Sequence, residues 1–499
     1  MMISKNQINN KEYEIPNILD DSVSIENFLD KNKSKPVVVV QGLGFVGAVM
    51  SIVCANALNQ EYAVIGVDLP TKNSFWRIKS INEGVFPVIS SDLKIEEYYQ
   101  LSRKKNNFLA TYDSLAYSKA DVIIVDINLD VQKDKQLNGD LKSFGVNLNP
   151  FKKAISDIAH NCKEDVLILI ETTVPPGTTE NIVKPIIEEN FTKRGLCIGK
   201  YKLGHSYERV MPGPDYIDSI QNFYRVYSGI NERSADSVEL FLKTIISTKK
   251  YPLTRLGNTN STEMAKVLEN SYRAMNISFM VEWSRFAEEA KVNLYEVVNA
   301  IRMRPTHNNL MLPGIGVGGY CLTKDPLMAS WSKKEIFGSK SGLEKSENGV
   351  ETNDKMPLYA YNSMLRFFNL KDLKNKSILC LGVSYRSDVG DTRYTPVESF
   401  YNYLIKDKCS VTLHDPYVKY WEELKLEINQ SIEDIFNYQF DIVVFTTAHK
   451  EYKKSKSLIN HLNSQKRLKI FDTVGILSHQ EIKQLQNKHS VFVLGRGDL

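Results

Sequence analysis

The sequence predicts an α/β protein with two doubly wound parallel sheets joined by a long central α-helix. Short β-branched runs alternate with helical segments in the first half of the chain, and the same alternation returns after residue 376. Alternation of this kind is typical of parallel sheets covered by helices. Between the two halves, the segment from Thr262 to Val292 has helical periodicity without Pro or Gly. A chain of 499 residues is also longer than a single domain with one hydrophobic core usually is, so more than one domain is expected.

The first strand, PVVVV from Pro36, leads directly into GLGFVG, with Gly42, Gly44 and Gly47. Glycines let backbone N–H groups and a helix N-terminus approach a phosphate closely. The next strand, YAVIGVDL, ends at Asp68, about 20 residues on, where a carboxylate accepts hydrogen bonds from ribose hydroxyls. The combination predicts a dinucleotide site, against the alternative of a glycine turn that serves only helix packing. Because an acid repels a 2′-phosphate and no Arg follows directly, NAD is favoured over NADP.

Two further strand and helix units, ADVIIVDI and DVLILIE, extend this sheet. The second ends in ETTVPPGTTE, where Pro175 and Gly177 stop the strand ahead of a helix that begins near Thr178. Ligands bind at the carboxyl ends of such strands. Thr173 is therefore a candidate for holding a water or a sugar hydroxyl, whereas capping of the strand end explains Thr172 better.

A long helix is predicted from Thr262, and it carries Lys266 and Asn270 on one face because they are four residues apart. A glycine-rich loop follows, GIGVGGYCLTKDP, with Cys321 just beyond its glycines and Asp325 four residues later. A lone Cys is more often a small buried hydrophobe than a nucleophile. The flexible loop and the neighbouring charges of Lys324 and Asp325 keep the nucleophile interpretation open.

Five strand candidates after this loop predict a second doubly wound domain: KSILCLGVSY, SVTLHDPY, FDIVVFTTAH, RLKIFDTV and SVFVLGRG. Its first turn has glycine only at Gly382, so a second NAD site is not indicated. Between the first strand and helix lies RSDVGDTRYTP. Its Arg386 and Arg393 could grip a diphosphate or belong to surface ion pairs.

Composition argues against several classes of protein. Lys and Arg total 63 against 59 for Asp and Glu, an excess too small to indicate nucleic-acid binding. The six scattered cysteines, without a CxxC pair, indicate reduced thiols and a cytoplasmic location. The apolar stretch from Val37 to Leu58 contains Gln41 and Asn56, so a strand, turn and helix explain it better than a membrane span. The polar first 34 residues look like a loosely ordered extension, and the sequence shows no metal-ligand cluster.

The chain resembles the UDP-glucose/GDP-mannose dehydrogenase family in six motifs, which occur in this order: GLGFVG, ETTVPPGTT, EMAKVLENSYRAMN, GVGGYCLTKDP, LGVSYRSDVGDTRYTP and HDPY. The resemblance covers almost everything after Lys35. It implies an N-terminal extension (1–34), an NAD-binding Rossmann domain (35–235), a central helical dimerisation and catalytic-loop region (236–350) and a Rossmann-like UDP-sugar-binding domain (351–499). The implied partners are a UDP-sugar substrate and a second copy of the chain.

The resemblance implies that an NAD-dependent enzyme oxidises a sugar C6 alcohol to a carboxylate in two steps, for bacterial surface polysaccharides. Cys321 would hold the sugar as a thiohemiacetal and then as a thioester. Lys266 would stabilise oxyanion charge, Asn270 would orient the reacting oxygen, and Asp325 would position water and the lysine. Glu208 of HSYERVMPG would be the base for thioester hydrolysis, supported by Thr173.

The binding residues implied in the same way fall into two groups. Those for NAD are Gly42, Gly44, Phe45, Val46, Gly47, Asp68, Thr173 and Lys324. Those for the sugar nucleotide are Glu208, Arg209, Lys266, Asn270, Arg304, Gly318, Gly319, Arg386 and Arg393, with Arg304 reaching a neighbouring subunit. No residue is assigned to a metal.

The chain departs from the family pattern at three places: Tyr207 replaces Pro, Arg386 replaces Lys, and DINLDV replaces a VPTP-like strand end. The segments ERVMPG and RPTHNN to GVGGYCLTKDP are closer to the branch that acts on UDP-N-acetylhexosamines than to the GDP-mannose branch. UDP-glucose and GDP-mannose 6-dehydrogenases stay as alternatives. Two others are a two-electron dehydrogenase of the hydroxyacid type and a noncatalytic sensor of NAD and sugar nucleotides.

Overall fold

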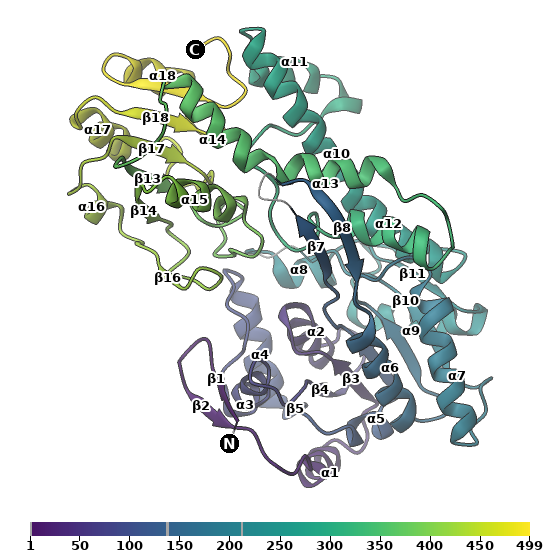
Figure 1. The fold of residues 1–499 in the computed structure, drawn as a ribbon. Coiled ribbons are helices and arrows are strands. Elements are labelled where there is room, and N and C mark those ends of the chain that lie inside the picture. Colours follow the sequence, from purple (N-terminus) through teal and green to yellow (C-terminus); the bar gives the residue numbers. More distant parts are fainter. Residues whose placement is uncertain (1, 136–138, 211–212) are drawn as a thin grey trace. The chain divides into compact units, whose positions relative to one another are not determined.

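The computed structural model describes residues 2–135, 139–210 and 213–499 (Figure 1). The chain forms two compact units. Unit 1 comprises residues 1–130, 146–267 and 331–339, and unit 2 comprises residues 131–145, 268–330 and 340–499. Within the described ranges, no helix is long and apolar enough to cross a membrane.

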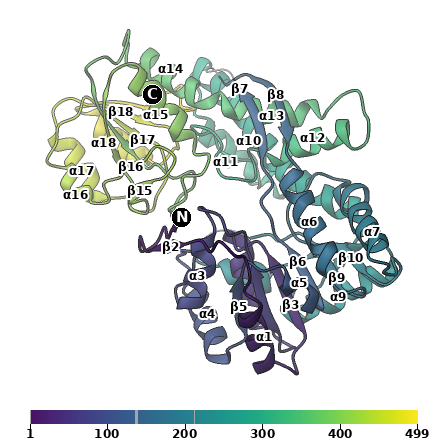
Figure 2. The same cartoon turned by 60° about the horizontal axis from the view of Figure 1, so that its bottom comes forward.

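Unit 1 is built on an eight-stranded sheet in the order β12-β11-β10-β9-β6-β3-β4-β5. Its strands are β3 (Val37–Gln41), β4 (Ala63–Val67), β5 (Phe108–Thr111), β6 (Val122–Val125), β9 (Leu167–Ile170), β10 (Lys202–His205), β11 (Val226–Gly229) and β12 (Thr254–Arg255). All neighbours are parallel except β10 and β11. Strands β3, β4, β6 and β9 are buried along their whole length, as expected of a sheet covered on both faces (Figure 2). The predicted parallel sheet is confirmed, and β5, β10, β11 and β12 extend it beyond the prediction.

The helices of unit 1 follow the strands in alternation, as the predicted strand and helix units require. They are α2 (Phe45–Ala55), α3 (Phe75–Glu83), α4 (Leu93–Lys105), α5 (Leu115–Lys119), α6 (Asn149–Asn161), a π-helical turn (Thr179–Val183), α7 (Lys184–Lys193), α8 (Tyr216–Gln221) and α9 (Glu232–Ile245). Only the glycine turn separates helix α2 from β3, and nearly all residues of α2 are buried.

The N-terminal extension is ordered, contrary to the prediction of a loosely ordered segment. It forms the hairpin β1 (Ile3–Lys5) and β2 (Glu12–Glu14), followed by helix α1 (Ser22–Lys31). Ser4 is fully buried. Its hydroxyl accepts a hydrogen bond from the backbone N–H of Trp76 at 3.0 Å and donates one to the carbonyl of Lys72 at 2.8 Å. Tyr13 and Ile15 also pack into the hydrophobic core of unit 1. These few apolar residues are scattered in a polar segment, so its composition did not reveal them.

Helix α10 (Thr259–Glu289) confirms the predicted long helix. Its first turns are anchored by Glu263, a fully buried side chain that accepts hydrogen bonds from the backbone N–H groups of Gly177 at 2.6 Å and Thr179 at 2.8 Å. The chain continues through α11 (Leu294–Arg302), a 3-10 turn (Pro305–His307), α12 (Asp325–Glu335), α13 (Glu344–Asp354) and α14 (Met356–Phe367).

Unit 2 holds a five-stranded parallel sheet in the order β14-β13-β17-β18-β19. All five predicted strands are confirmed: β13 (Ser377–Leu381), β14 (Ser410–His414), β17 (Ile442–Phe445), β18 (Lys469–Asp472) and β19 (Ser490–Val493). The helices are α15 (Pro396–Lys406), α16 (Ile432–Ile435), α17 (Lys456–Ser464) and α18 (His479–Gln486), and β15 (Tyr420–Trp421) pairs with β16 (Leu426–Glu427). A hairpin that was not predicted, β7 (Val131–Lys135) and β8 (Leu141–Val146), belongs largely to this unit (Figure 1).

Candidate active site

A cavity of about 340 Å³ lies in unit 1 at the carboxyl ends of β3, β4 and β6. Six residues predicted to bind the cofactor line it: Gly42, Gly44, Phe45, Val46, Gly47 and Asp68. Helix α2 begins at Phe45, so its first turn forms part of the cavity wall. The N-terminus of a helix attracts anions because its first N–H groups lack partners within the helix. The cavity therefore fits the pyrophosphate of a dinucleotide.

Gly47 is required by a close approach of two backbone segments. A Cβ atom added to Gly47 would lie 2.0 Å from the carbonyl oxygen of Gly42. No side chain fits that space, so the first turn of α2 can approach the strand end only because this position is glycine. The contact supports the interpretation of GLGFVG as a phosphate-binding turn.

Asp68 stands at the end of β4, where the sequence predicted a ribose ligand. Its Oδ2 accepts a hydrogen bond from the backbone N–H of Leu43 at 3.2 Å and lies 3.5 Å from the guanidinium of Arg77. Burial raises the pKa of Asp68, and the charge of Arg77 acts against that rise. The sequence argument for NAD noted that no Arg follows directly. Helix α3 nevertheless brings Arg77 into the same cavity, so the preference for NAD rests on the carboxylate of Asp68.

Lys266 and Glu208 are together in unit 1. Glu208 follows β10, and Lys266 lies near the start of α10. The ammonium of Lys266 donates a hydrogen bond to the backbone carbonyl of Glu208 at 2.8 Å and lies 3.7 Å from Oε1 of its carboxylate. Both side chains are largely buried, which strengthens the electrostatic attraction between them.

Tyr207, which replaces the Pro of the family pattern, lies beneath this pair. Its ring centre is 5.3 Å from the ammonium of Lys266 and 5.4 Å from the guanidinium carbon of Arg209. Aromatic faces attract cations at such distances. The departure from Pro therefore supplies a buried ring that holds two cations. Met211 and Pro212 of the ERVMPG segment lie outside the described residues.

The two threonines after β9 differ in their roles. The hydroxyl of Thr172 donates to the carbonyl of Val125 at 3.1 Å and accepts from the N–H of Ile127 at 2.7 Å. The preferred interpretation of Thr172 as a strand-end cap is thus confirmed. Thr173, the next residue, is half-buried at the same edge of the sheet.

In unit 2, Asp325 organises the surroundings of Cys321. Asp325 is fully buried. It accepts hydrogen bonds from the side-chain amide of Asn270 at 2.6 Å and from the ammonium of Lys324 at 2.8 Å. Its backbone N–H donates to the carbonyl of Cys321 at 2.9 Å, just before α12 begins. Cys321 is an exposed residue, as access of a substrate requires. Since the ammonium of Lys324 is engaged in this buried network, its predicted contact with NAD stays a prediction.

Gly319 lets the loop that bears Cys321 pack tightly on the segment after β13. Its φ of +80° is left-handed, and a Cβ atom there would lie 2.6 Å from the ring of Tyr385. Its N–H donates to the carbonyl of Arg393 at 3.1 Å. A Cβ on Gly318 would lie 2.4 Å from Tyr385. The loop glycines thus place Cys321 beside the RSDVGDTRYTP segment.

The two arginines of that segment differ in their partners. Arg393 makes a two-pronged ion pair with Asp391, with distances of 2.7 and 3.0 Å. Burial opposes the charge of Arg393, but Asp391, Tyr385 and Cys321 outweigh it and raise the pKa of the guanidinium. Arg386 is exposed, and its guanidinium forms no ion pair with any residue the structure describes. Arg386 is therefore the more available of the two for a diphosphate.

Arg304 is exposed where the 3-10 turn after α11 begins. Helix α10 also leaves large apolar side chains exposed along its length: Met264, Leu268, Tyr272, Phe279, Trp283 and Phe286. A contiguous series of this kind is typical of a surface that contacts another protein.

The end of strand β14 in the second sheet has different contacts from the end of β4. Asp415 ends β14 as Asp68 ends β4, but it accepts hydrogen bonds from the backbone N–H groups of Val383 at 2.8 Å and Ser384 at 3.1 Å. His449 Nε2 lies 3.1 Å from the same carboxylate. These contacts engage the Oδ2 atom of Asp415 within unit 2. The expectation drawn from the missing glycines, that this sheet has no second NAD site, stays a prediction.

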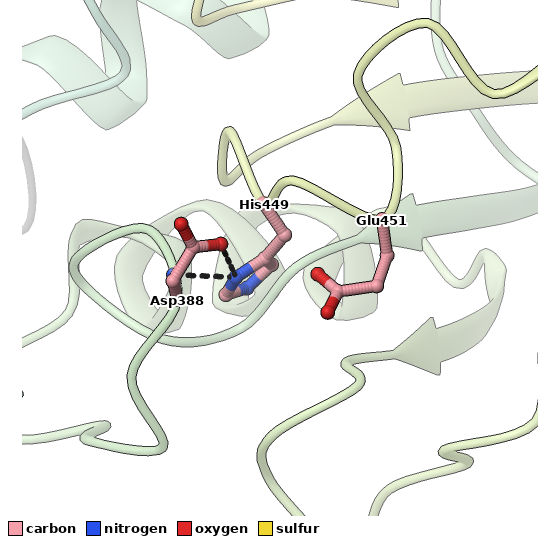
Figure 3. A group of neighbouring side chains, drawn as sticks. All are labelled: Asp388, His449 and Glu451. Carbon is pink, nitrogen blue, oxygen red and sulfur yellow. Dashed lines mark hydrogen bonds and ion pairs between the residues drawn. The ribbon is translucent and has the colours of Figure 1, made fainter. Parts of the chain in front are cut away.

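Asp388, His449 and Glu451 lie close together beside this carboxylate, in an arrangement that resembles a metal site (Figure 3). The Nδ1 atom of His449 accepts a hydrogen bond from the backbone N–H of Asp388 at 2.9 Å, so Nε2 carries the proton that faces Asp415. Neither ring nitrogen offers a lone pair to a cation. Glu451 accepts a hydrogen bond from the hydroxyl of Tyr417 at 2.7 Å. The group is explained as a hydrogen-bonded cluster in the segments that follow β13 and β17 of the second sheet.

Comparison with known proteins adds three domain matches. They are to the UDP-glucose/GDP-mannose dehydrogenase family: its NAD binding domain over residues 36–245, its central domain over residues 260–354 and its UDP binding domain over residues 379–479. The UDP-N-acetyl-D-mannosamine dehydrogenase of Methanocaldococcus jannaschii is 30% identical over 479 residues, 94% of this chain and 99% of the relative.

Two solved structures have a similar fold. The UDP-D-ManNAc dehydrogenase of Pyrococcus horikoshii matches with a TM-score of 0.75 and 26% identity, over 93% of this chain and 100% of that chain. The NDP-N-acetyl-D-galactosaminuronic acid dehydrogenase of Methanosarcina mazei matches in fold with a TM-score of 0.76 and 24% identity, over 95% and 98% of the two chains.

Proposed function

The chain belongs to the UDP-glucose/GDP-mannose dehydrogenase family, whose members are NAD-dependent nucleotide-sugar dehydrogenases, and on that premise we propose that it oxidises C6 of a UDP-N-acetylhexosamine to the uronic acid. The observation that carries the proposal is the exposed Cys321 beside the buried network of Asp325 and Asn270. The choice of an N-acetylhexosamine is supported by the relative from Methanocaldococcus jannaschii, which is named for UDP-N-acetyl-D-mannosamine. The product is a precursor of surface polysaccharides.

Two oxidations are needed to convert an alcohol to a carboxylate, and bound NAD⁺ supplies the hydride acceptor for each. After the first, the Sγ atom of Cys321 forms a bond to the aldehyde carbon, and the oxygen takes up a proton. Loss of a second hydride and of that proton leaves a thioester. Water then attacks the thioester carbon, the C–S bond breaks, and the carboxylate and the thiol of Cys321 are released.

The surrounding residues have separate tasks in this sequence. Lys266 is held by Glu208 with its charge in a largely buried place, where it stabilises negative charge on the reacting oxygen. Asn270 is held by Asp325 and orients the same oxygen. Glu208 removes a proton from the hydrolytic water, which Thr173 supports. Asp325 acts by holding Asn270 and Lys324.

The sugar nucleotide and the second subunit complete the proposal. Arg386 and Arg393 bind the diphosphate, because guanidinium groups match phosphate oxygens in charge and geometry. Two copies of the chain associate through the exposed apolar side chains of α10, and the exposed Arg304 reaches the substrate of the partner subunit. Burial of those aromatic rings in a dimer removes them from water.

The test is NADH release by the purified protein with NAD⁺ and a panel of UDP-ManNAc, UDP-GlcNAc, UDP-GalNAc, UDP-glucose and GDP-mannose. We expect two NADH per sugar consumed with one UDP-N-acetylhexosamine, and loss of uronic acid in Cys321→Ser with NAD binding retained. One NADH per sugar would support a two-electron dehydrogenase. Tight binding of NAD and UDP-sugars without NADH or a covalent adduct would support a sensor. Turnover of UDP-glucose or GDP-mannose alone would replace the proposed substrate.

A further inference from the structure

Asp126 has a carboxyl group in the cofactor cavity that the proposed mechanism does not use. It follows β6 and lines the cavity together with the GLGFVG turn. Its Oδ2 atom is buried and has no hydrogen-bond partner among the described residues. The same atom lies 3.2 Å from the position that a Cβ on Gly47 would take. Oδ2 is therefore next to the first turn of α2, where the pyrophosphate of a dinucleotide is expected to bind.

The place of Asp126 in the sheet agrees with this contact. Strand β3 pairs with β4 on one side and with β6 on the other. The end of β4 carries Asp68, the ribose ligand, so the end of β6 lies across the point where the strand order reverses. Dinucleotides bind across that point. The backbone N–H of Asp126 donates to the carbonyl of Gln41 at 2.9 Å, which fixes the residue beside the glycine turn.

The charge state of Asp126 decides what it can do there. Burial and the carboxylate of Glu208 raise the pKa of Asp126 to about 8, against the opposing charges of Arg225 and Lys266. A carboxyl group that is protonated at neutral pH has one O–H to donate. An ionised carboxylate in the same place has only acceptors and repels a diphosphate.

The other charged groups near Asp126 come from every element around the cavity. They are Asp68 and Arg77 at the ribose end, Lys153 and Asp157 on α6, Arg225 with its ion-paired partner Glu171, and Glu208 with Lys266. Asp68, Glu171 and Glu208 each have an ion-pair partner within unit 1, whereas Asp126 Oδ2 has no hydrogen-bond partner in the described part of the chain.

We propose that Asp126 is a further NAD-binding residue of this chain, which donates a hydrogen bond from its protonated carboxyl to a pyrophosphate oxygen and excludes the cofactor when it ionises. The residue lies in DINLDV, where the chain departs from the family pattern, so the resemblance does not imply this role. NAD binding becomes weaker as pH rises through the pKa of this one group.

The experiment measures the Kd of NAD⁺ by calorimetry, without sugar, at pH 7, 8 and 9. If only the protonated form binds, the competent fraction falls from about nine tenths at pH 7 to about one tenth at pH 9, so the Kd rises about tenfold. Asp126→Asn keeps a donor that cannot ionise, so its Kd should match the wild type at pH 7 and stay constant to pH 9. Asp126→Ala should bind about two- to tenfold more weakly at pH 7, from loss of one hydrogen bond, and also without pH dependence.

The control is Asp157→Asn, another carboxylate of the same cavity, which should keep the tenfold rise of the wild type. Thermal melting of each variant establishes that it is folded. A wild-type Kd that is constant from pH 7 to 9, or a rise of the wild-type size in Asp126→Asn, would overturn the proposal. Because the readout is NAD⁺ binding alone, it is independent of the proposed substrate.

Discussion

Removal of the Asp325 carboxylate tests the network that surrounds the nucleophile. Asp325→Ala leaves the ammonium of Lys324, a side chain 4% exposed, without its anion, and the amide of Asn270 without its acceptor. Breaking a buried ion pair in this way costs about 3–5 kcal/mol. The ring of Tyr320, 4.5 Å from the ammonium, recovers up to ~1 kcal/mol. We therefore expect the free energy of unfolding to fall by about 2–4 kcal/mol.

The assay is urea unfolding followed by tryptophan fluorescence, with NADH turnover measured on the same samples. Asp325→Ala combined with Lys324→Met removes both charges and should recover at least half of the lost stability, because no buried charge is left unpaired. Turnover should not recover, because the side-chain amide of Asn270 still lacks its hydrogen bond to a carboxylate at position 325. Glu335→Ala, an exposed acid on the same helix, is the matched control and should change stability by less than about 0.5 kcal/mol. A loss below about 1 kcal/mol in Asp325→Ala, or no recovery in the double variant, would refute the reasoning.

Three further predictions follow from the cofactor cavity and the lysine. Asp68→Ser should raise the kcat/KM for NADP relative to the kcat/KM for NAD at least tenfold. The carboxylate that repels a 2′-phosphate is lost, whereas the guanidinium of Arg77, which lies 3.5 Å from that carboxylate in the wild type, stays. The gain should vanish when Asp68→Ser is combined with Arg77→Met. Gly47→Ala should abolish NAD binding in calorimetry, since its Cβ would lie 2.0 Å from a backbone oxygen, and wild-type affinity would contradict the phosphate-turn interpretation. Tyr207→Leu should lower kcat about fivefold, because it removes an aromatic ring whose attraction for the ammonium of Lys266 is worth about 1 kcal/mol. Tyr207→Phe keeps the ring and should keep most of the wild-type kcat. Equal losses of kcat in the two variants would exclude a role for the ring.

Much of the fold was predictable because its signals are local. The run of residues 37–40 before the glycine turn is apolar at every position, as a strand buried on both faces requires, and Gly47 is required by the backbone of Gly42, five residues before it. Helix α10 has strong helix formers over many turns, so its propensity and periodicity agree. The five strands of the second sheet are short β-branched runs between helical segments. Where local preference and tertiary packing agree, sequence alone determines the element.

Only the tertiary structure decided which residues meet in the site. Strand β10 has the sequence KLGH, which has no strand signature of its own, yet its pairing with β9 brings Glu208 to the edge of the sheet that binds ligands. Arg77 reaches Asp68 from the next helix, which the distance along the chain did not indicate. Asp126 is an ordinary acid in the sequence, and its charge state follows from burial and from Glu208, which lies far along the chain. Sequence determined the chemistry that is available, whereas burial and long-range pairing, which depend on the whole fold, determined the partners and the charge of each group.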